Sequence, residues 1–288
     1  MLSISEDEIV EILENAKEIF KGEPNYIELE SDKPMIFVGD THGDIETTKH
    51  ITKRFLGVNR LVLLGDYVDR SPSEMGSIKN IIHLLELKVK NPDLIMLRGN
   101  HEFSSIFSRY DFKEELYDAG FDETKKLFED VFSQMPYIIS TENGLIGLHG
   151  GLPNISDSEE IKNLPKGIKD YNCNTIISQI VWNDNVVDNE ILEGEDFESN
   201  SDRGFYDDGG LIYGESYFSE KMKILGKNVL VRGHDYRAKG FSLNDRILTI
   251  FTSRAYTGEG MLKGTYVAVM DDPQKEIKSA RDLRIEYV

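Results

Sequence analysis

Three short apolar segments near the start of the sequence each run directly into a polar motif that contains glycine. Helical periodicity separates the segments, since residues 45–56 and 75–89 place apolar side chains on one face. This alternation predicts parallel strands joined by crossover helices, with all three motifs at one edge of a sheet. The segments and their motifs are Pro34–Val38 with Gly39–Asp44, Leu61–Leu64 with Gly65–Arg70, and Leu94–Leu97 with Arg98–Glu102.

An N-terminal amphipathic helix and a second group of strands are predicted on either side of this region. Ser5 and Glu8 form a capping-box pattern, and Gly22 and Pro24 end the helix that follows. The other predicted segments are mostly helical structure at 102–135, a long irregular loop at 188–210 and a helix at 215–225. Short strands are predicted at 137–140, 145–148, 228–231, 247–252 and 265–270, and the last two are expected to be the final strands.

The acidic composition argues against some classes of partner. The 288 residues include 33 Lys and Arg against 52 Asp and Glu, which gives a net charge of −19. This charge repels nucleic-acid backbones and anionic membranes, so we expect neither as a partner. The single cysteine, Cys173, excludes an intramolecular disulfide and fits the reducing cytoplasm. The acidic N-terminus lacks the basic region of a signal peptide, and no apolar run approaches the roughly 20 residues that span a bilayer.

Six residues at predicted strand ends form a candidate metal set. Carboxylate oxygens and imidazole nitrogens without a thiolate suit manganese, iron or zinc in a catalytic site. Six ligands are too many for one tetrahedral ion, whereas two ions that share Asp66 account for the number. His50 and His83 lie in helical segments without glycine-flanked motifs, so we expect them to be solvated or packed. The candidate ligands are Asp40, His42, Asp66, Asn100, His149 and His234.

Five motifs, in their order along the chain, resemble the signature set of a known enzyme family. They are GDTHG (39–43), GDYVDR (65–70), RGNHE (98–102), HGG (149–151) and RGH (232–234). The set resembles the PPP family of metal-dependent serine/threonine protein phosphatases, in the calcineurin-like metallophosphoesterase superfamily, over about residues 35–270. The resemblance implies an α/β metallophosphoesterase fold, with a central β-sandwich flanked by helices in four α-β-β-α layers. We find no linker or repeat, so we expect one catalytic domain over 1–288, with an N-terminal helical extension at 1–34 and a short C-terminal segment at 271–288.

The resemblance implies hydrolysis of phosphoserine and phosphothreonine in proteins at a centre of two divalent ions, with Mn²⁺ expected in vitro and iron or zinc as alternatives. A metal-bridging hydroxide would attack phosphorus in line, without a phosphoenzyme. His101 would be the general acid and Asp69 its partner, since a nearby carboxylate raises the pKa of an imidazole. A turn-capping role is the alternative for Asp69. The implied ligands are Asp40, His42 and Asp66 for one ion, and Asp66, Asn100, His149 and His234 for the other.

The family resemblance also implies a set of phosphate-binding residues. A guanidinium fork binds phosphate oxygens in bidentate fashion, and Arg203 is included because SDRG resembles a family segment. Tyr256 is included because the loop SRAYTG resembles one that overhangs the family's active site. A solvated side chain is the alternative for Arg203, and both phosphate contact and carboxylate pairing suit Arg98 and Arg232. The implied set is Arg70, Arg203, Tyr256 and Asn100.

Some positions depart from the family pattern without touching a candidate ligand. Ser71-Pro72 follows GDYVDR where glycine is common, WNDN (182–185) replaces WSDP, and SRAYTG (253–258) lacks the Pro-Asn pair and cysteine of eukaryotic members. These changes call the inhibitor sensitivity and regulatory docking of eukaryotic members into question. The short C-terminal segment resembles that of prokaryotic or archaeal members.

Other functions are compatible with the same motifs. Related enzymes hydrolyse dinucleoside polyphosphates, and a broad-specificity phosphatase would also accept phosphotyrosine. A metal-binding scaffold without catalysis is the alternative from another class, and the presence of both His101 and Asp69 argues against it. Phosphoproteins are the expected partners, and the sequence does not identify regulatory subunits. The acidic segment 188–208 leads to the hypothesis that substrates have basic residues beside the phosphate.

Overall fold

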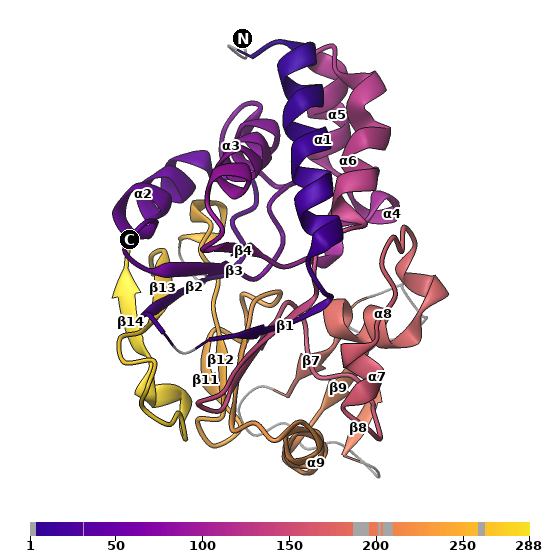
Figure 1. Cartoon of the computed structure of the whole chain (residues 1–288). Helices are drawn as coiled ribbons and strands as arrows, with labels where there is room; N and C mark the ends of the chain where they lie inside the picture. The colour runs from indigo at the N-terminus through magenta and orange to yellow at the C-terminus, as the bar shows by residue number, and fades with distance from the viewer. Residues whose placement is uncertain (1–3, 31, 187–195, 201–202, 204–209, 259–262) are drawn as a thin grey trace.

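Two β-sheets stacked face to face form the centre of the molecule (Figure 1). The computed structural model describes residues 4–30, 32–186, 196–200, 203, 210–258 and 263–288. In spatial order, the first sheet contains β1 (Tyr26–Leu29), β5 (Ile138–Thr141), β6 (Leu145–Leu148), β10 (Val229–Arg232), β12 (Ile247–Thr249) and β11 (Gly240–Ser242). The second contains β14 (Arg284–Tyr287), β13 (Tyr266–Met270), β2 (Met35–Val38), β3 (Arg60–Leu63) and β4 (Leu94–Met96). A small third sheet contains β7 (Asp184–Asn185), β9 (Leu211–Tyr213) and β8 (Phe197–Ser199).

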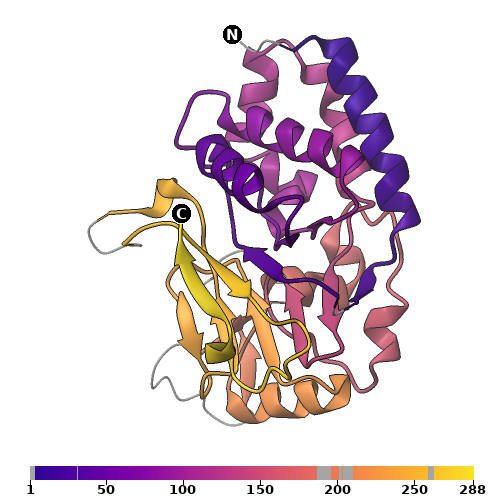
Figure 2. The same cartoon turned by 60° about the vertical axis from the view of Figure 1, so that its left-hand side comes forward.

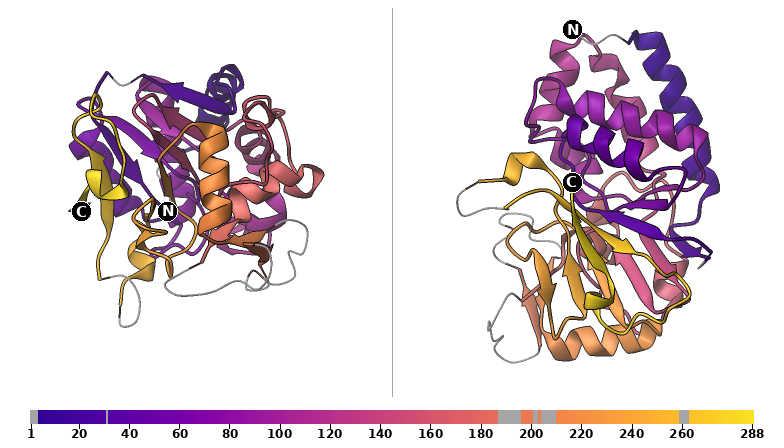
Figure 3. Two further views of the ribbon diagram at one scale, coloured as in Figure 1. Left: turned by 90° about the horizontal axis from the view of Figure 1, so that it is seen from below. Right: turned by 90° about the vertical axis from the view of Figure 1, so that its left-hand side faces the viewer.

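Helices cover the outer faces of both large sheets (Figures 1 and 2). One helical layer packs on the five-stranded sheet and contains α1 (Glu6–Gly22), α2 (Ile45–Phe55), α3 (Gly76–Lys90), α4 (Ser104–Phe107), α5 (Asp111–Asp118) and α6 (Lys125–Phe132). The other lies on the six-stranded sheet and contains α7 (Glu159–Lys162), α8 (Thr175–Trp182) and α9 (Glu215–Leu225). Together with the two sheets they give the four-layer α-β-β-α arrangement, so the predicted fold class is confirmed (Figure 3).

The apolar core between the sheets explains why the central strands contain almost no polar residues. Phe37 and Val62 of the five-stranded sheet belong to the same buried cluster as Leu145, Val231 and Leu248 of the six-stranded sheet. Strands buried on both faces have continuous apolar sequences instead of alternating ones. This is the pattern from which the strands were predicted.

The predicted order strand–helix–strand–helix–strand is confirmed for β2, α2, β3, α3 and β4. These three strands run parallel, and Val38 lies level with Leu63, which in turn lies level with Met96. The motifs that follow the three strands therefore meet at one edge of the sheet. In the facing sheet, β6 and β10 are also parallel, so His149 and His234, which follow them, reach the same end of the sandwich.

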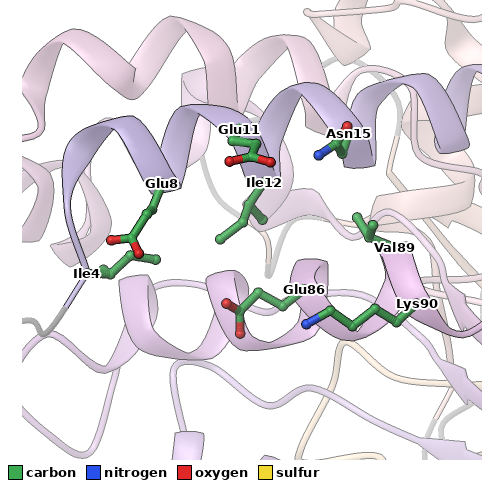
Figure 4. Close-up of a pocket in the computed structure, with 8 residues that line it drawn as sticks. All are labelled: Ile4, Glu8, Glu11, Ile12, Asn15, Glu86, Val89 and Lys90. Carbon is green, nitrogen blue, oxygen red and sulfur yellow. The ribbon is translucent and has the colours of Figure 1, made fainter.

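The N-terminal helix α1 forms as its sequence predicts. Ser5 and Glu8 make the capping box, and one apolar face of the helix is buried. On its outer side, α1 and α3 border a surface groove of about 500 Å³. Figure 4 shows the apolar side chains of Ile12 and Val89 facing this groove, with Glu11 and Glu86 along it. No helix in the described part of the chain is both long and apolar enough to cross a membrane.

The elements that the sequence does not predict are three edge strands of the two large sheets, the strands of the third sheet and the helices α7 and α8. β1, β11 and β14 were not predicted, and β14 follows the two segments expected to be the final strands. Two of these strands, β1 (YIEL) and β14 (RIEY), contain charged residues, because part of each strand is exposed at the margin of its sheet. Neither strand therefore has the continuous apolar sequence from which the central strands were predicted. The short strand β8 also lies within the stretch 188–210 that was predicted as an irregular loop. The rest of that prediction at 188–195, 201–202 and 204–209 falls outside the described residues.

Candidate active site

The first candidate metal group lies where β2 and β3 end. Nε2 of His42 is 3.7 Å from Oδ2 of Asp40 and 3.7 Å from Oδ2 of Asp66. His42 is fixed by a 2.9 Å hydrogen bond between its Nδ1 and the carbonyl oxygen of Val68, which leaves Nε2 for the site. All three side chains are buried. His101 also offers a ligand atom within 4.8 Å of those of His42 and Asp66.

The second candidate group joins the two sheets. Nε2 of His149 lies 3.4 Å from Oδ1 of Asp66 and 2.9 Å from Oδ1 of Asn100. Nδ1 of His234 lies 3.1 Å from the same Asn100 oxygen. Nδ1 of His149 contacts the carbonyl oxygen of Leu64 at 2.9 Å, which sets the orientation of the ring. Asp66 thus stands between the two groups, as predicted for a shared ligand.

The donor set fits divalent cations. Oδ2 of Asp40 and Nε2 of both His42 and His234 are buried and have no hydrogen-bond partner among the described residues. Buried polar atoms are normally paired, so the unpaired Oδ2 of Asp40 and Nε2 of His42, which lie 3.7 Å apart, call for a ligand that accepts electron pairs. The oxygen and nitrogen donors with no thiolate suit manganese, iron or zinc in a catalytic site. All six residues predicted as metal ligands are brought together here.

Burial and neighbouring charges shift the pKa values of the candidate ligands in both directions, so His149 would have to release a proton to bind a metal. Burial opposes ionisation of Asp66, but the neighbouring histidines, His149 first, hold the pKa of its carboxyl well below its usual range. Burial likewise opposes protonation of His149, but Asp66 raises the pKa of His149 to about 9. Burial lowers the pKa of His42 to about 3 and raises that of Asp40 to about 7. An anionic Asp66 and an unprotonated His42 are the forms that bind a metal.

The backbone at this edge is strained, and the strain coincides with the candidate residues. Nine non-glycine residues in the described part of the chain have positive φ angles, and five of them are candidate site residues with angles between 40° and 73°: His42, Asp66, Asp69, Arg70 and His234. Non-glycine residues in this region cost of order 1–3 kcal/mol each and persist where surrounding contacts hold them. Such outliers concentrate at functional sites, so the observation points to the same edge as the polar groups do.

Two glycines of the motifs are required by close packing of the ligands. A Cβ atom on Gly99 would lie 2.2 Å from Oδ1 of Asp66, and one on Gly233 would lie 2.3 Å from Oδ1 of Asp40. Any side chain at either position would displace a candidate metal ligand. The glycines in RGNHE and RGH therefore make room for the carboxylates that arrive from the neighbouring strands.

His101 and Asp69 form a buried pair beside the metal groups. Nδ1 of His101 lies 2.7 Å from Oδ2 of Asp69, which leaves Nε2 of His101 available to the site. Oδ1 of Asp69 accepts the N–H of Phe112 at 2.9 Å, so the carboxylate is held from a second side. The expected rise in the pKa of His101 is wrong for this structure, because burial lowers it to about 3. Burial raises the pKa of Asp69 to about 8, although its bond from Phe112 acts in the other direction.

Two tyrosines hold the predicted phosphate-binding residue Arg70. Nη1 of Arg70 donates to the hydroxyl of Tyr256 at 2.9 Å, and Nη2 donates to the hydroxyl of Tyr110 at 3.3 Å. The guanidinium carbon lies 4.9 Å from the centre of the Tyr110 ring. The ring of Tyr256 is stacked on that of His42, with centroids 5.5 Å apart. Arg70 and Tyr256, which were both predicted, are thus placed at the metal edge, and Asn100 lies between His149 and His234.

The other predicted phosphate ligand, Arg203, is bound in bidentate fashion to Asp184. Its Nε and Nη2 lie 2.6 and 2.8 Å from the two carboxylate oxygens. Its charge is close enough to contribute, after burial, to the lowered pKa of His234. Asp184 also accepts from Nη2 of the buried Arg232 at 2.7 Å, so carboxylate pairing is the interpretation that fits Arg232.

Arg98 has a structural role in this arrangement. It is 1% exposed, and its Nη1 donates to the Tyr137 hydroxyl at 2.9 Å and to the carbonyl oxygen of Ile168 at 2.5 Å. Its guanidinium carbon lies 3.5 Å from the centre of the Phe103 ring. Its Nη2 donates to the carbonyl oxygen of Glu102 at 3.2 Å, so the side chain holds the RGNHE turn. As expected, His50 is exposed, and His83 packs between helices with Nε2 3.1 Å from the Thr52 hydroxyl.

Three residues that position the site were not identified from the sequence. Glu102 accepts the main-chain N–H groups of Asp66, Tyr67 and Gly99 at 2.8–2.9 Å, which fastens the two ligand-bearing loops to each other. Tyr110 supports Arg70, and Asp184 links Arg203 to Arg232. Glu102 lies inside the RGNHE motif, two residues after the candidate ligand Asn100, and this place in the motif was the signal available in the sequence. Asp184 stands in WNDN (182–185) where the family's WSDP also has aspartate, and this position was its signal, whereas Tyr110 carries none.

A β-sandwich with two carboxylate–histidine groups at one end defines a metallophosphoesterase. Residues 33–238 match the family described as calcineurin-like phosphoesterase. The match covers well over half of the sequence, and the chain belongs to this family.

Relatives and solved structures agree with this assignment. The chain is 28% identical over 276 residues to a Caenorhabditis elegans protein named as a serine/threonine-protein phosphatase, covering 92% of the chain and 57% of that protein. It is 29% identical over 267 residues to one from Encephalitozoon cuniculi with the same kind of name, covering 89% of the chain and 54% of the relative. The chain therefore spans little more than half the length of these relatives.

Two solved structures illustrate the shared fold. A protein serine/threonine phosphatase from Saccharomyces cerevisiae superposes with a TM-score of 0.81 at 20% identity, covering 98% of this chain and 89% of the other. A cold-active protein-tyrosine phosphatase from a psychrophilic Shewanella superposes with a TM-score of 0.56 at 14% identity, covering 89% and 80%. At these identities the superpositions establish the fold.

Proposed function

We propose that this protein is a metal-dependent phosphatase that hydrolyses phosphoserine and phosphothreonine in proteins. The observation that carries the proposal is the buried His101–Asp69 pair, which adjoins two carboxylate–histidine groups and faces the side of the site that Arg70 lines. A scaffold that only binds metal needs the ligands but has no use for this pair. The names of the two relatives support a phosphoprotein substrate.

The ligands would divide between two ions. Asp40, His42 and Asp66 would hold one, and Asp66, Asn100, His149 and His234 would hold the other. Bound divalent ions would supply a water nucleophile at neutral pH and neutralise charge on the phosphate. Mn²⁺ is the ion to use first in vitro, with iron and zinc as alternatives.

The chain's own residues orient the substrate and manage the leaving-group proton. The Arg70 guanidinium offers donors to phosphate oxygens, and its two tyrosine contacts set its direction. Burial lowers the pKa of His101 to about 3 but raises that of Asp69 to about 8, so at neutral pH the pair would hold its proton on the Asp69 side. Nε2 of His101 would donate its proton to the departing serine or threonine oxygen while Nδ1 takes up the proton of Asp69. Phosphate would thus lie between the Arg70 side and the two metal groups.

Phosphate release from matched phosphoserine, phosphothreonine and phosphotyrosine peptides, each with Mn²⁺ and with chelator, tests the proposal. We expect metal-dependent release from the first two. Comparable phosphotyrosine turnover would identify a broad-specificity enzyme. No release from any peptide by protein with two bound metals would refute the proposal and direct the search to dinucleoside polyphosphates.

His101→Asn tests the role of the general acid. The variant should retain its metal content while the rate falls by about 10²–10⁴. Metal analysis and turnover measured on the same preparation separate the two effects. A rate equal to that of the wild type would show that another group protonates the leaving oxygen.

A further inference from the structure

An arginine in the loop between β12 and β13 is bonded to the aspartate that follows the first metal motif. The main-chain N–H of Arg254 donates to Oδ2 of Asp44 at 2.8 Å. Its Nε lies 3.0 and 2.9 Å from the two carboxylate oxygens, and its Nη2 lies 2.6 Å from Oδ1. One carboxylate therefore receives both the backbone and the guanidinium fork of a residue 210 positions away. A bidentate, charge-assisted contact of this kind is strong and directional.

Asp44 is a rigid anchor for this contact. Its side chain is fully buried, and it caps α2 by accepting the N–H of Thr47 at 3.2 Å and the Thr47 hydroxyl at 2.8 Å. It also lies two residues after the candidate ligand His42. A group tied to Asp44 is therefore fixed relative to the metal groups.

The other end of the contact is a single tight turn that carries Tyr256. Arg254–Tyr256 form one 3₁₀ turn, in which the Ser253 side chain accepts the N–H of Ala255. The hydroxyl of Thr257 donates to the carbonyl oxygen of Arg254 at 2.8 Å. Because the turn is internally bonded, Arg254 and Tyr256 move together.

Tyr256 connects this turn to the phosphate side of the site. Its ring packs on Phe251 at 4.6 Å between centroids and stacks on His42, while its hydroxyl accepts from Nη1 of Arg70. The contacts form a continuous path from Asp44 through Arg254 and Tyr256 to the exposed guanidinium of Arg70.

We propose that the Arg254–Asp44 ion pair is a positioning contact that sets Tyr256 over the site and thereby orients Arg70 toward phosphate. The inference rests on the proposed phosphatase function, since it assigns Arg254 a role in binding the substrate's phosphate. Arg254 itself is a positioning residue, because its fork is occupied by Asp44. Without the guanidinium contact, only the Arg254 main-chain N–H would tie the turn to Asp44, and Tyr256 would direct the Arg70 fork less firmly.

Arg254→Gln is the variant that tests the proposal. It keeps the main-chain N–H and most of the side chain but removes the charge and the fork. With Mn²⁺-loaded protein, we expect inorganic phosphate to bind about 10-fold more weakly, which corresponds to the loss of one hydrogen bond to a charged group. The KM for a phosphopeptide should rise by a similar factor, with kcat changed less. Arg254→Lys, which restores the charge without the fork, should recover part of the loss.

A double-mutant cycle distinguishes positioning from general damage. Tyr256→Phe removes only the hydroxyl that contacts Arg70, so Arg254→Gln should add little further loss in that background. Arg281→Gln is the matched control, because Arg281 is also an exposed arginine paired with an aspartate, Asp245, on another part of the surface. The control should leave phosphate binding and the kinetic constants unchanged.

Calorimetric titration with inorganic phosphate keeps this test separate from the test of the proposed function. If wild-type protein binds phosphate but hydrolyses no phosphopeptide, the proposed function fails while the variants still report on the contact. Unchanged phosphate affinity in Arg254→Gln would overturn the inference. So would equal losses in the wild-type and Tyr256→Phe backgrounds, or no phosphate binding by wild-type protein loaded with Mn²⁺.

Discussion

Replacing Glu102 with alanine should damage both the stability of the fold and the metal centre. The Glu102 side chain is fully buried, and its two oxygens accept three main-chain N–H groups, from Asp66, Tyr67 and Gly99. The substitution leaves all three donors without a partner. A buried donor that loses its acceptor costs about 1–3 kcal/mol, so the loss should total about 3–6 kcal/mol, allowing for partial hydration of the new cavity.

The same substitution should weaken metal binding, because Glu102 fixes the loop that carries Asp66. Loss of an outer contact of this kind typically costs about 10–100-fold in metal affinity. Urea denaturation measures the stability and calorimetric Mn²⁺ titration measures the affinity. Glu276→Ala, at an exposed carboxylate paired with Lys278, is the control and should change neither quantity. A stability loss below about 1 kcal/mol, with wild-type Mn²⁺ affinity, would refute this account of Glu102.

Three further predictions concern groups around the site and the core. Asp184→Asn should lower the free energy of unfolding by about 3–5 kcal/mol, because it leaves Arg203 and Arg232 beside an uncharged partner. Urea denaturation measures this, and a change of less than about 1 kcal/mol would contradict the prediction. Glu115→Ala should cost about 1–2 kcal/mol in the same assay, since its carboxylate caps the N-terminus of α3, and equal stability would disprove the cap. Burial lowers the pKa of Lys166 to about 8 from 10.5, so between these pH values the unfolded chain binds more protons than the folded one. The free energy of unfolding of the wild type, relative to that of Lys166→Met, should therefore rise with pH over this range. A difference between the two proteins that does not change with pH would contradict the shift.

The metal edge was predictable because its residues are attached to local patterns. Asp40, Asp66 and Asn100 each follow an apolar strand within a few residues, and parallel strands must bring their carboxyl ends to one edge. His149 and His234 follow strands of the second sheet in the same way. In these cases the sequence neighbour of each ligand determines where the ligand lies.

The supporting contacts were not predictable, because they join residues that are far apart in the sequence and have no pattern of their own. Asp184 meets Arg232 across 48 positions, and Asp44 meets Arg254 across 210. Edge strands such as β14 were missed for a related reason. Their sequences reflect exposure at the sheet margin, which depends on which strand happens to lie outermost.

The strained residues show why these long-range contacts matter for the site. Asp66 holds a positive φ, and its N–H and that of Tyr67 are both accepted by Glu102, while its Oδ1 accepts the N–H of His101. A conformation that costs of order 1–3 kcal/mol at one residue needs such contacts on both sides. The ligand motifs therefore specify which atoms can bind metal, whereas distant carboxylates determine whether those atoms are held in place. For this reason, substitutions at Glu102 or Asp184 should impair the centre without removing a single ligand.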